Sequence, residues 1–347
     1  MQSTYEEEEM GSNEEYDLAK FFPSVLCESD WSSTERVILD ISTKKFQSIT
    51  NPRFKDANCV SSKDGWLLFV NVHPSNYACR LPFLVNPSTG DQIDMPELTF
   101  GPKIGCPLYS LSVVSGTPSY VVCVINNPRG MTLYVASPQA QVGHVWESYK
   151  FGAYDRHTQI CTCVTLESRH QVLCLGYNGE VIAFDLLDLS WTHNSQLRLR
   201  TLNSCVWYFE SGGEVLRVNA LRPFFSSFVF YKLHMEDDRT TMTWVELDQS
   251  ELENTSWFMG GSSFRVKGYQ QGKKLYVLKP NSYGGPNGPD FETAKRKTVY
   301  HGRPYGSDMD ANVYIHDLDS PDFATYTLMP DSFRTKHISW VQLNCLI

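Results

Sequence analysis

One hydrophobic pattern recurs along the chain: three apolar β-forming residues, a polar residue, a turn and a second short strand. Residues 37–40 lead through a polar turn to residues 46–49, and residues 83–86 lead through a Pro-Ser-Thr-Gly turn to residues 92–95. Short apolar runs bounded by turn residues are typical of β-strands. Further copies begin at Leu133, Ile182, Val229 and Val313. The pattern therefore predicts six β-hairpins.

The spacing of these hairpins indicates a repeat. Their starts are separated by 46, 50, 49, 47 and 84 residues, and the long interval contains a Gly/Pro-rich insertion at residues 280–312. A period near 50 is typical of propeller blades, and further β-rich runs between the hairpins supply the remaining strands. We predict an all-β fold, a β-propeller of six four-stranded blades. Five or seven blades would fit shifted boundaries, and a pair of β-sandwiches is the competing architecture.

The two ends of the pattern are complementary. The hairpin at Val37 has no recognisable inner strands before it, and residues 338–343 have no outer hairpin after them. Pairing between them would complete a mixed blade and remove exposed sheet edges. We therefore expect one propeller domain over residues 25–347, closed by pairing of the N-terminal hairpin with the C-terminal strand. No window holds a long helical period, so helical content should be very low.

Charge is unevenly distributed along the 347 residues. Seven acidic residues precede the first basic residue, Lys20, which leaves 32 acidic residues against all 30 Lys and Arg in the rest. We predict that residues 1–24 form an acidic, disordered tail, because a run of Glu cannot bury apolar surface. The nearly neutral body disfavours nucleic-acid binding. The apolar runs are shorter than the roughly 20 residues of a membrane span, and no targeting pattern is recognisable, so we expect the cytoplasm or nucleus as the compartment. We also expect a monomer.

The chemistry-bearing residues form no recognisable site. Ten cysteines occur without a Cys-x-x-Cys pair, and Cys161 and Cys163 lie two apart, which predicts that both point to one face of a strand. We interpret the cysteines as buried thiols, and we expect no metal, no cofactor and no catalytic residue. The alternative is a propeller enzyme, either a hydrolase with a carboxylate pair from different blades or an oxidase using Tyr300 to Tyr305. A channel cluster of carboxylates or histidines without ion-pair partners would favour it.

The insertion holds the basic residues most suited to a partner. A loop of this length is uncommon unless it binds something or is disordered. A propeller gathers its loops on two faces, where a rigid ring positions them. Lys295, Arg296, Lys297 and Arg303 are therefore our candidate partner-binding residues, for an acidic protein surface. A solvated loop and a weak nuclear signal are the alternatives.

Five segments carry a resemblance to a known family: residues 61–68, 83–90, 207–216, 244–247 and 257–264. Together and in this order they resemble the KIB-type propellers of plant F-box proteins, catalogued as domain of unknown function 295. The resemblance implies a protein-binding propeller of the ubiquitin ligase pathway, with a protein kinase or another ligase target as partner. Members commonly carry an F-box that docks on Skp1, and no such module is recognisable here. A true ligase receptor with a divergent N-terminus is the alternative.

Overall fold

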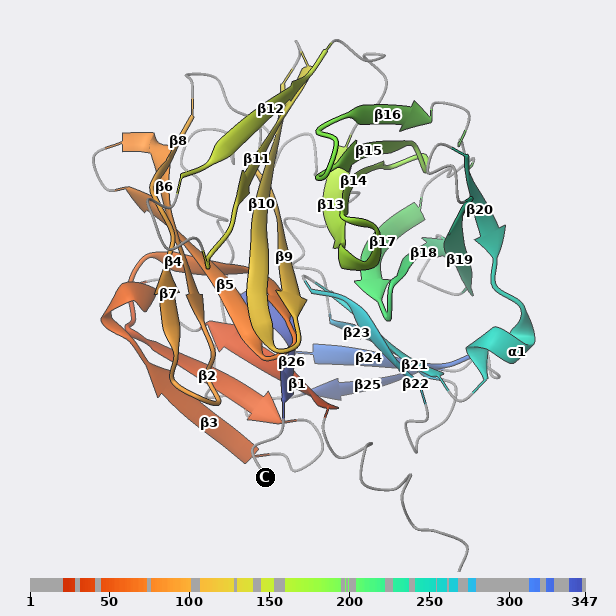
Figure 1. The fold of residues 1–347 in the computed structure, drawn as a ribbon. Helices are drawn as coiled ribbons and strands as arrows, with labels where there is room; N and C mark the ends of the chain where they lie inside the picture. The colour runs from red at the N-terminus through yellow and green to blue at the C-terminus, as the bar shows by residue number, and fades with distance from the viewer. Residues whose placement is uncertain are drawn as a thin grey trace, which may run out of the picture.

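Six sheets, built mainly from antiparallel strands, are arranged as the blades of a ring in the computed structural model (Figure 1). The structure describes residues 21–28, 32–40, 45–73, 76–100, 107–127, 130–139, 145–152, 160–194, 197, 199, 204–221, 227–236, 241–253, 255–260, 262–267, 274–278, 312–318, 323–327 and 337–344. The predicted six-bladed propeller is confirmed.

The blades are numbered in chain order, and the first three contain the strands from β1 to β12 together with the C-terminal strand. Blade 1 consists of β26 (His337–Asn344), β1 (Phe21–Glu28), β2 (Glu35–Asp40) and β3 (Lys45–Thr50). Blade 2 consists of β4 (Ala57–Lys63), β5 (Trp66–His73), β6 (Asn76–Val85) and β7 (Gln92–Asp94), with β8 (Leu98–Thr99) on β6. Blade 3 consists of β9 (Leu108–Val114), β10 (Thr117–Asn127), β11 (Gly130–Ala136) and β12 (Glu147–Phe151).

The other three blades complete the circle. Blade 4 consists of β13 (Ile160–Leu166), β14 (Gln171–Gly176), β15 (Val181–Asp185) and β16 (Trp191–Asn194). Blade 5 consists of β17 (Ser204–Ser211), β18 (Glu214–Leu221), β19 (Ser227–Met235) and β20 (Met242–Glu246). Blade 6 consists of β22 (Phe264–Lys267), β21 (Thr255–Met259), β23 (Lys274–Leu278), β24 (Asn312–Asp317) and β25 (Phe323–Thr327). Its fifth strand arises because β21 and β23 pair in parallel.

The ends of the chain close the ring, as expected, through a strand that the sequence pattern did not reveal. β26 pairs antiparallel with β1 over eight residue pairs, from Phe21↔Asn344 to Glu28↔His337, and β1 pairs with β2. In Figure 1 the blue β26 lies beside the red β1. The hairpin at Val37 is therefore preceded by a strand of its own blade. This strand begins at Phe21, four residues before the expected start of the domain.

The described core is divided into seven hydrophobic clusters: two lie at the boundary between blades 2 and 3, and one lies at each of the other five boundaries between neighbouring blades. Leu26 of blade 1 packs with Phe69 of blade 2, and the same arrangement repeats around the ring. The last cluster joins Phe258 and Tyr276 of blade 6 to Val25 and Leu39 of blade 1. Every blade therefore buries both of its faces against its neighbours, and none has a core of its own.

Hydrogen bonds from side chains bridge the same boundaries. Arg36 of β2 is 1% exposed and donates to the carbonyl oxygens of Phe54 and Ala57 at 2.6 and 2.9 Å, on the path from blade 1 to blade 2. The indole of Trp66 donates to Gly116 O at 2.9 Å, from blade 2 to blade 3. The indole of Trp244 donates to Gly179 O at 2.8 Å, from blade 5 to blade 4. The Arg36 bonds satisfy buried backbone carbonyls, and all of these bonds link neighbouring blades.

The expectation that Cys161 and Cys163 share one face of a strand is wrong. The register between β13 and β14 shifts between Ile160 and Thr162, so Cys161 occupies a β-bulge. An extra residue in one strand reverses the alternation of side chains on that strand. Cys163 consequently packs between blades 3 and 4, whereas Cys161 packs between blades 4 and 5. Six of the seven described cysteines are buried thiols, which agrees with their interpretation as small hydrophobic residues.

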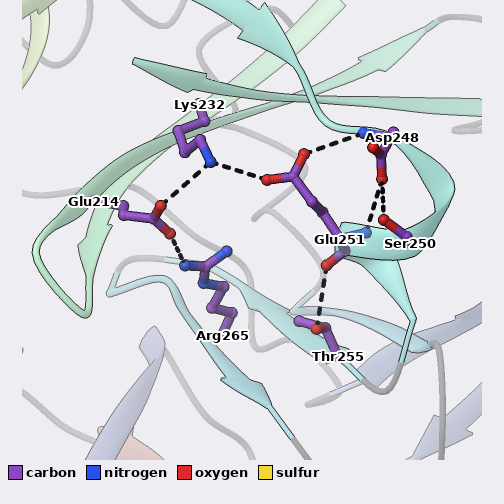
Figure 2. A network of polar contacts seen from close by, with 7 residues as sticks. All are labelled: Glu214, Lys232, Asp248, Ser250, Glu251, Thr255 and Arg265. Carbon is purple, nitrogen blue, oxygen red and sulfur yellow. Dashed lines mark hydrogen bonds and ion pairs between the residues drawn. The ribbon is translucent and has the colours of Figure 1, made fainter. Parts of the chain in front are cut away.

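An ionic network joins blades 5 and 6 (Figure 2). Glu214 of β18 pairs with Arg265 of β22 and lies 3.4 Å from the ammonium of Lys232, which lies 2.9 Å from Glu251. Glu251 also completes a capping box with Asp248 on the short helix α1 (Gln249–Leu252). Burial acts to raise the pKa of Glu214, but the hydrogen bond and charge of Arg265, with Lys232, outweigh it and lower that pKa.

Helical structure is scarce in the described ranges: α1 and the two short 3-10 turns η2 (Pro52–Phe54) and η3 (Glu167–Arg169). Among the residues whose structure is described, none of the helices has the length and apolar character needed to cross a membrane.

Removal of β26 should abolish cooperative folding. A chain truncated after residue 336 leaves β1 as an unpaired edge and removes one strand of the inner ring, so we expect a broad unfolding transition and self-association. A chain lacking only residues 345–347 is the control. Urea denaturation followed by tryptophan fluorescence, with size-exclusion chromatography, measures both effects. A sharp, monomeric transition for the 1–336 chain would contradict the role given to the closure.

Glu214→Gln should destabilise the protein by about 1 kcal/mol at pH 7, because Glu214 is partly exposed and its ion pairs are screened by solvent. The folded-state pKa of Glu214 is lowered, so its contribution is present above the ordinary value of 4.5 and is lost as pH falls through the lower folded value. Urea denaturation between pH 7 and 3 should show the difference from wild type shrinking toward zero. The exposed Glu253→Gln is the control, and a difference independent of pH would refute this assignment.

Candidate functional site

A central cavity of about 410 Å³ lies on the axis of the ring. The inner strands contact one another in the order β26, β4, β9, β13, β17 and β22, and five of them supply described residues to the lining. Pockets of roughly 300–1,000 Å³ are typical of ligand sites. Serine and threonine residues are prominent in the lining: Ser61, Ser62, Ser110, Thr162, Thr165, Ser211, Ser262 and Ser263.

Tight turns at the ends of the inner strands form the mouth of this channel. Asp64–Gly65 joins β4 to β5, and Gly212–Gly213 joins β17 to β18. Both residues of each turn have positive φ, 45° and 86° in the first and 63° and 79° in the second. Two-residue hairpins with this conformation match the twist of the strands they join, and Gly and Asp tolerate it best. The rim of the mouth is therefore built from short, stiff connections.

An ion pair spans the channel at its mouth. The Lys63 ammonium of blade 2 lies 2.6 Å from a carboxylate oxygen of Glu210 in blade 5, and the two side chains are 21% and 14% exposed. Blades 2 and 5 are opposite each other in a ring of six, so this contact crosses the axis. The other oxygen of Glu210 accepts from Gly213 N at 2.7 Å, which fixes the carboxylate on its own turn.

Two further carboxylates lie at the mouth. Glu167 of η3 accepts hydrogen bonds from Ser112 and Ser119 of blade 3, the latter at 3.1 Å. Asp64 is half-buried, and no ion pair or hydrogen bond of its carboxylate is present among the described residues. Burial raises the pKa of Asp64, the Lys63 ammonium opposes this, and the charges of Glu210 and Glu167 raise the pKa further. Asp64 is thus the least compensated charge at the channel.

This arrangement suits the binding of a polar or charged group. Of the three described carboxylates, Glu210 is paired with Lys63, whereas Asp64 and Glu167 have no ion pair with a described residue, although Glu167 accepts hydrogen bonds from serines. Two such carboxylates at the channel are the feature that would favour the alternative of a propeller enzyme. Within the described part of the chain, no group of three or more His, Cys, Asp or Glu side chains could hold a metal ion. The neighbouring hydroxyl groups can both donate and accept hydrogen bonds.

A second buried charge, Arg217 of β18, belongs to the scaffold. Its guanidinium is fully buried, donates to Asn219 at 2.8 Å and to Tyr177 O at 3.2 Å, and lies 5.3 Å from the ring centre of Tyr208. Cation–π contacts of this kind compensate a desolvated guanidinium. Burial lowers the pKa of Arg217 from its ordinary value. A methyl group on Gly179 would lie 2.5 Å from this guanidinium, so no space for a ligand exists on that side.

The sequence-predicted site residues Lys295, Arg296, Lys297 and Arg303 lie outside the described residues, as do Tyr300 to Tyr305. The structure instead brings together Lys63, Asp64, Glu167 and Glu210, none of which was predicted to be a site residue, although the first two and Glu210 lie in segments that carry the family resemblance. Lys63 and Glu210 are 147 residues apart, so only the ring topology makes them neighbours. The turn signals Asp64-Gly65 and Gly212-Gly213 could have marked the rim.

Comparison with known proteins identifies the family. The family profile described as KIB1-4 beta-propeller matches residues 38–283. A search of curated proteins gives no match. Among solved structures, a crystal structure of a protein from Lactobacillus plantarum has 12% sequence identity and a TM-score of 0.40, covering 68% of this chain and 70% of its own. That similarity is too low to support an argument about function. Because the profile covers more than half of its length, this chain belongs to the KIB1-4 β-propeller family.

Proposed function

We propose that this chain is a non-catalytic protein-interaction module that presents a binding face at the mouth of its central channel. The observation that carries the proposal is the convergence of connections from four blades on one rim: residues 63–64, 167, 210–212 and 262–263 all line the cavity. Connections held by a rigid scaffold are the usual location of recognition residues. Membership of the KIB1-4 propeller family is consistent with this role.

The proposed partner is a protein in the cytoplasm or nucleus. By resemblance to the substrate-recognition propellers of plant F-box proteins, the chain would act in the ubiquitin ligase pathway and bind a protein kinase or another ligase target. Skp1 separates two versions of this role. A receptor within the ligase would bind Skp1 directly, whereas a separate binding module would hold the target without Skp1.

A bulky residue at the mouth should abolish partner binding. Ser211 lines the cavity, and Ser211→Trp would fill it. We expect the partners that purify with the tagged full chain from plant tissue, identified by mass spectrometry, to be lost from Ser211→Trp. Thr243→Trp, at an exposed position of the outer strand β20, is the matched control and should retain them. Partners absent from the wild-type chain, or retained equally by both variants, would refute the proposal.

The basic residues of the insertion give a separate prediction. Reversal of Lys295, Arg296 and Lys297 to Glu, with Arg303→Glu, should lower partner recovery at least tenfold if the partner surface is acidic. Lys55→Glu, at an exposed position between η2 and β4, changes charge outside the insertion and serves as the control. The same quantitative mass spectrometry measures both. Equal recovery from the quadruple variant would remove these residues from the partner surface.

A further inference from the structure

Lys63 occupies the channel mouth as a tethered cation. Its ammonium reaches across the axis to Glu210 at 2.6 Å, while the Ser62 backbone N–H beside it donates to Ser262 of blade 6 at 3.1 Å. The Glu210 carboxylate is held in place by Gly213 N, so it is preorganised to accept a cation whether or not Lys63 is present. The structure therefore contains a cation-accepting position that is filled by the chain itself.

The charge around this position is unbalanced. Of the described residues that line the cavity, three carry a carboxylate, Asp64, Glu167 and Glu210, and one carries an ammonium, Lys63. One further positive charge would reduce the excess of negative charge, and Asp64 is the carboxylate that Lys63 leaves unpaired. An incoming cation would therefore gain more electrostatic energy here than an anion or a neutral group.

The exchange of one cation for another at Glu210 is inexpensive. Both side chains of the pair keep some solvent contact, so water can reach them when the pair opens, and an incoming cation replaces the interaction that Glu210 loses. The flexible stem of a lysine allows its ammonium to move while the backbone stays fixed. Lys63 and Asp64 are adjacent, and their charges already interact, so a displaced Lys63 has a second carboxylate within reach.

The shape and lining of the cavity define the ligand. A cavity of about 410 Å³ holds more than one side chain's polar head, and the hydroxyl groups of Ser61, Ser62 and Ser211 offer acceptors beyond Glu210. A guanidinium has five N–H donors and an ammonium has three, so both can use several acceptors at once.

We propose that the channel mouth binds a cationic side chain, arginine or lysine, from a loop of the protein partner, and that this group displaces Lys63 from Glu210. The inference rests on the proposed function only for the source of the cation, because the chemistry of the position is independent of any partner.

The test uses the full chain and three probes in calorimetric titrations: arginine amide, agmatine and an acetylated Gly-Arg-Gly peptide amide. Lys63→Met removes the tethered competitor and should tighten binding about fivefold, whereas Glu210→Gln should weaken it at least tenfold. A structural role of the ion pair would move both variants in the same direction. Urea denaturation of each variant verifies that it is folded, and Lys55→Met is the control for loss of an exposed ammonium.

The outcomes separate the alternatives. Peptide binding that exceeds agmatine binding supports a side chain of a partner, and tighter binding of agmatine alone would overturn that source in favour of a small free cation. Weaker binding by Lys63→Met, unchanged binding by Glu210→Gln, or no binding to wild type and Lys63→Met would overturn the site itself. Probe binding without any recovered protein partner would refute the proposed function and leave the cation site intact.

Discussion

Pairing between β26 and β1 is the contact on which the rest of this ring depends. Each hydrophobic cluster is built from two blades, so every blade needs both neighbours to bury its faces. Blade 6 packs against residues of β1 and β2 in blade 1, and the C-terminal strand completes that sheet by pairing with β1. Joining the two ends of the chain lowers its conformational entropy, and this cost grows only slowly with the number of residues in the closed loop. The buried apolar surface of all six boundaries then offsets it.

The closed ring determines what can happen on its axis. The inner strands pack their side chains against neighbouring blades: Ser110 of β9 bonds to Thr165 of β13, and Leu111 packs toward blade 2. The groups that face the axis are therefore the edges of the inner strands and the residues at the strand ends, where the turns begin. Charged residues at these ends meet across the channel although they belong to blades that share no boundary. Ring geometry, and not local sequence, thus creates the Lys63–Glu210 contact.

Local pattern revealed the outer hairpins and several inner strands, among them β26, but missed the inner strands β1 and β4. The outer hairpins carry runs of apolar residues with clear turns, and all six were predicted from periodicity. Inner strands such as β4, with the sequence Ala-Asn-Cys-Val-Ser-Ser-Lys, mix small polar and apolar residues because both faces meet other blades at close quarters. β1 contains Pro23, which argues against a strand when read alone. The bulge at Cys161 adds one residue to β13 without any local signal.

The site was harder to predict than the fold, for a physical reason. A linear sequence displays only charges that are neighbours along the chain, such as Lys295 to Lys297, so it draws attention to concentrated charge. The channel mouth instead collects single charges from separate turns, and each of them looks like an ordinary solvated residue in its own segment. Only the partial burial of Lys63 and Glu210 and their pairing across the axis distinguish them.

Polar contacts in this protein fall into two groups that differ in the free energy needed to break them. Arg36 donates to the carbonyl groups of Phe54 and Ala57 inside a blade boundary, where a lost donor leaves a buried acceptor unsatisfied at a cost of about 1–3 kcal/mol. Lys63 and Glu210 retain contact with water, so either can be resolvated when their contact opens. The frame is therefore held by contacts that resist exchange, while the contact across the axis exchanges easily. A rigid rim around one exchangeable ion pair is the arrangement that lets a partner compete for a preformed carboxylate without deforming the ring.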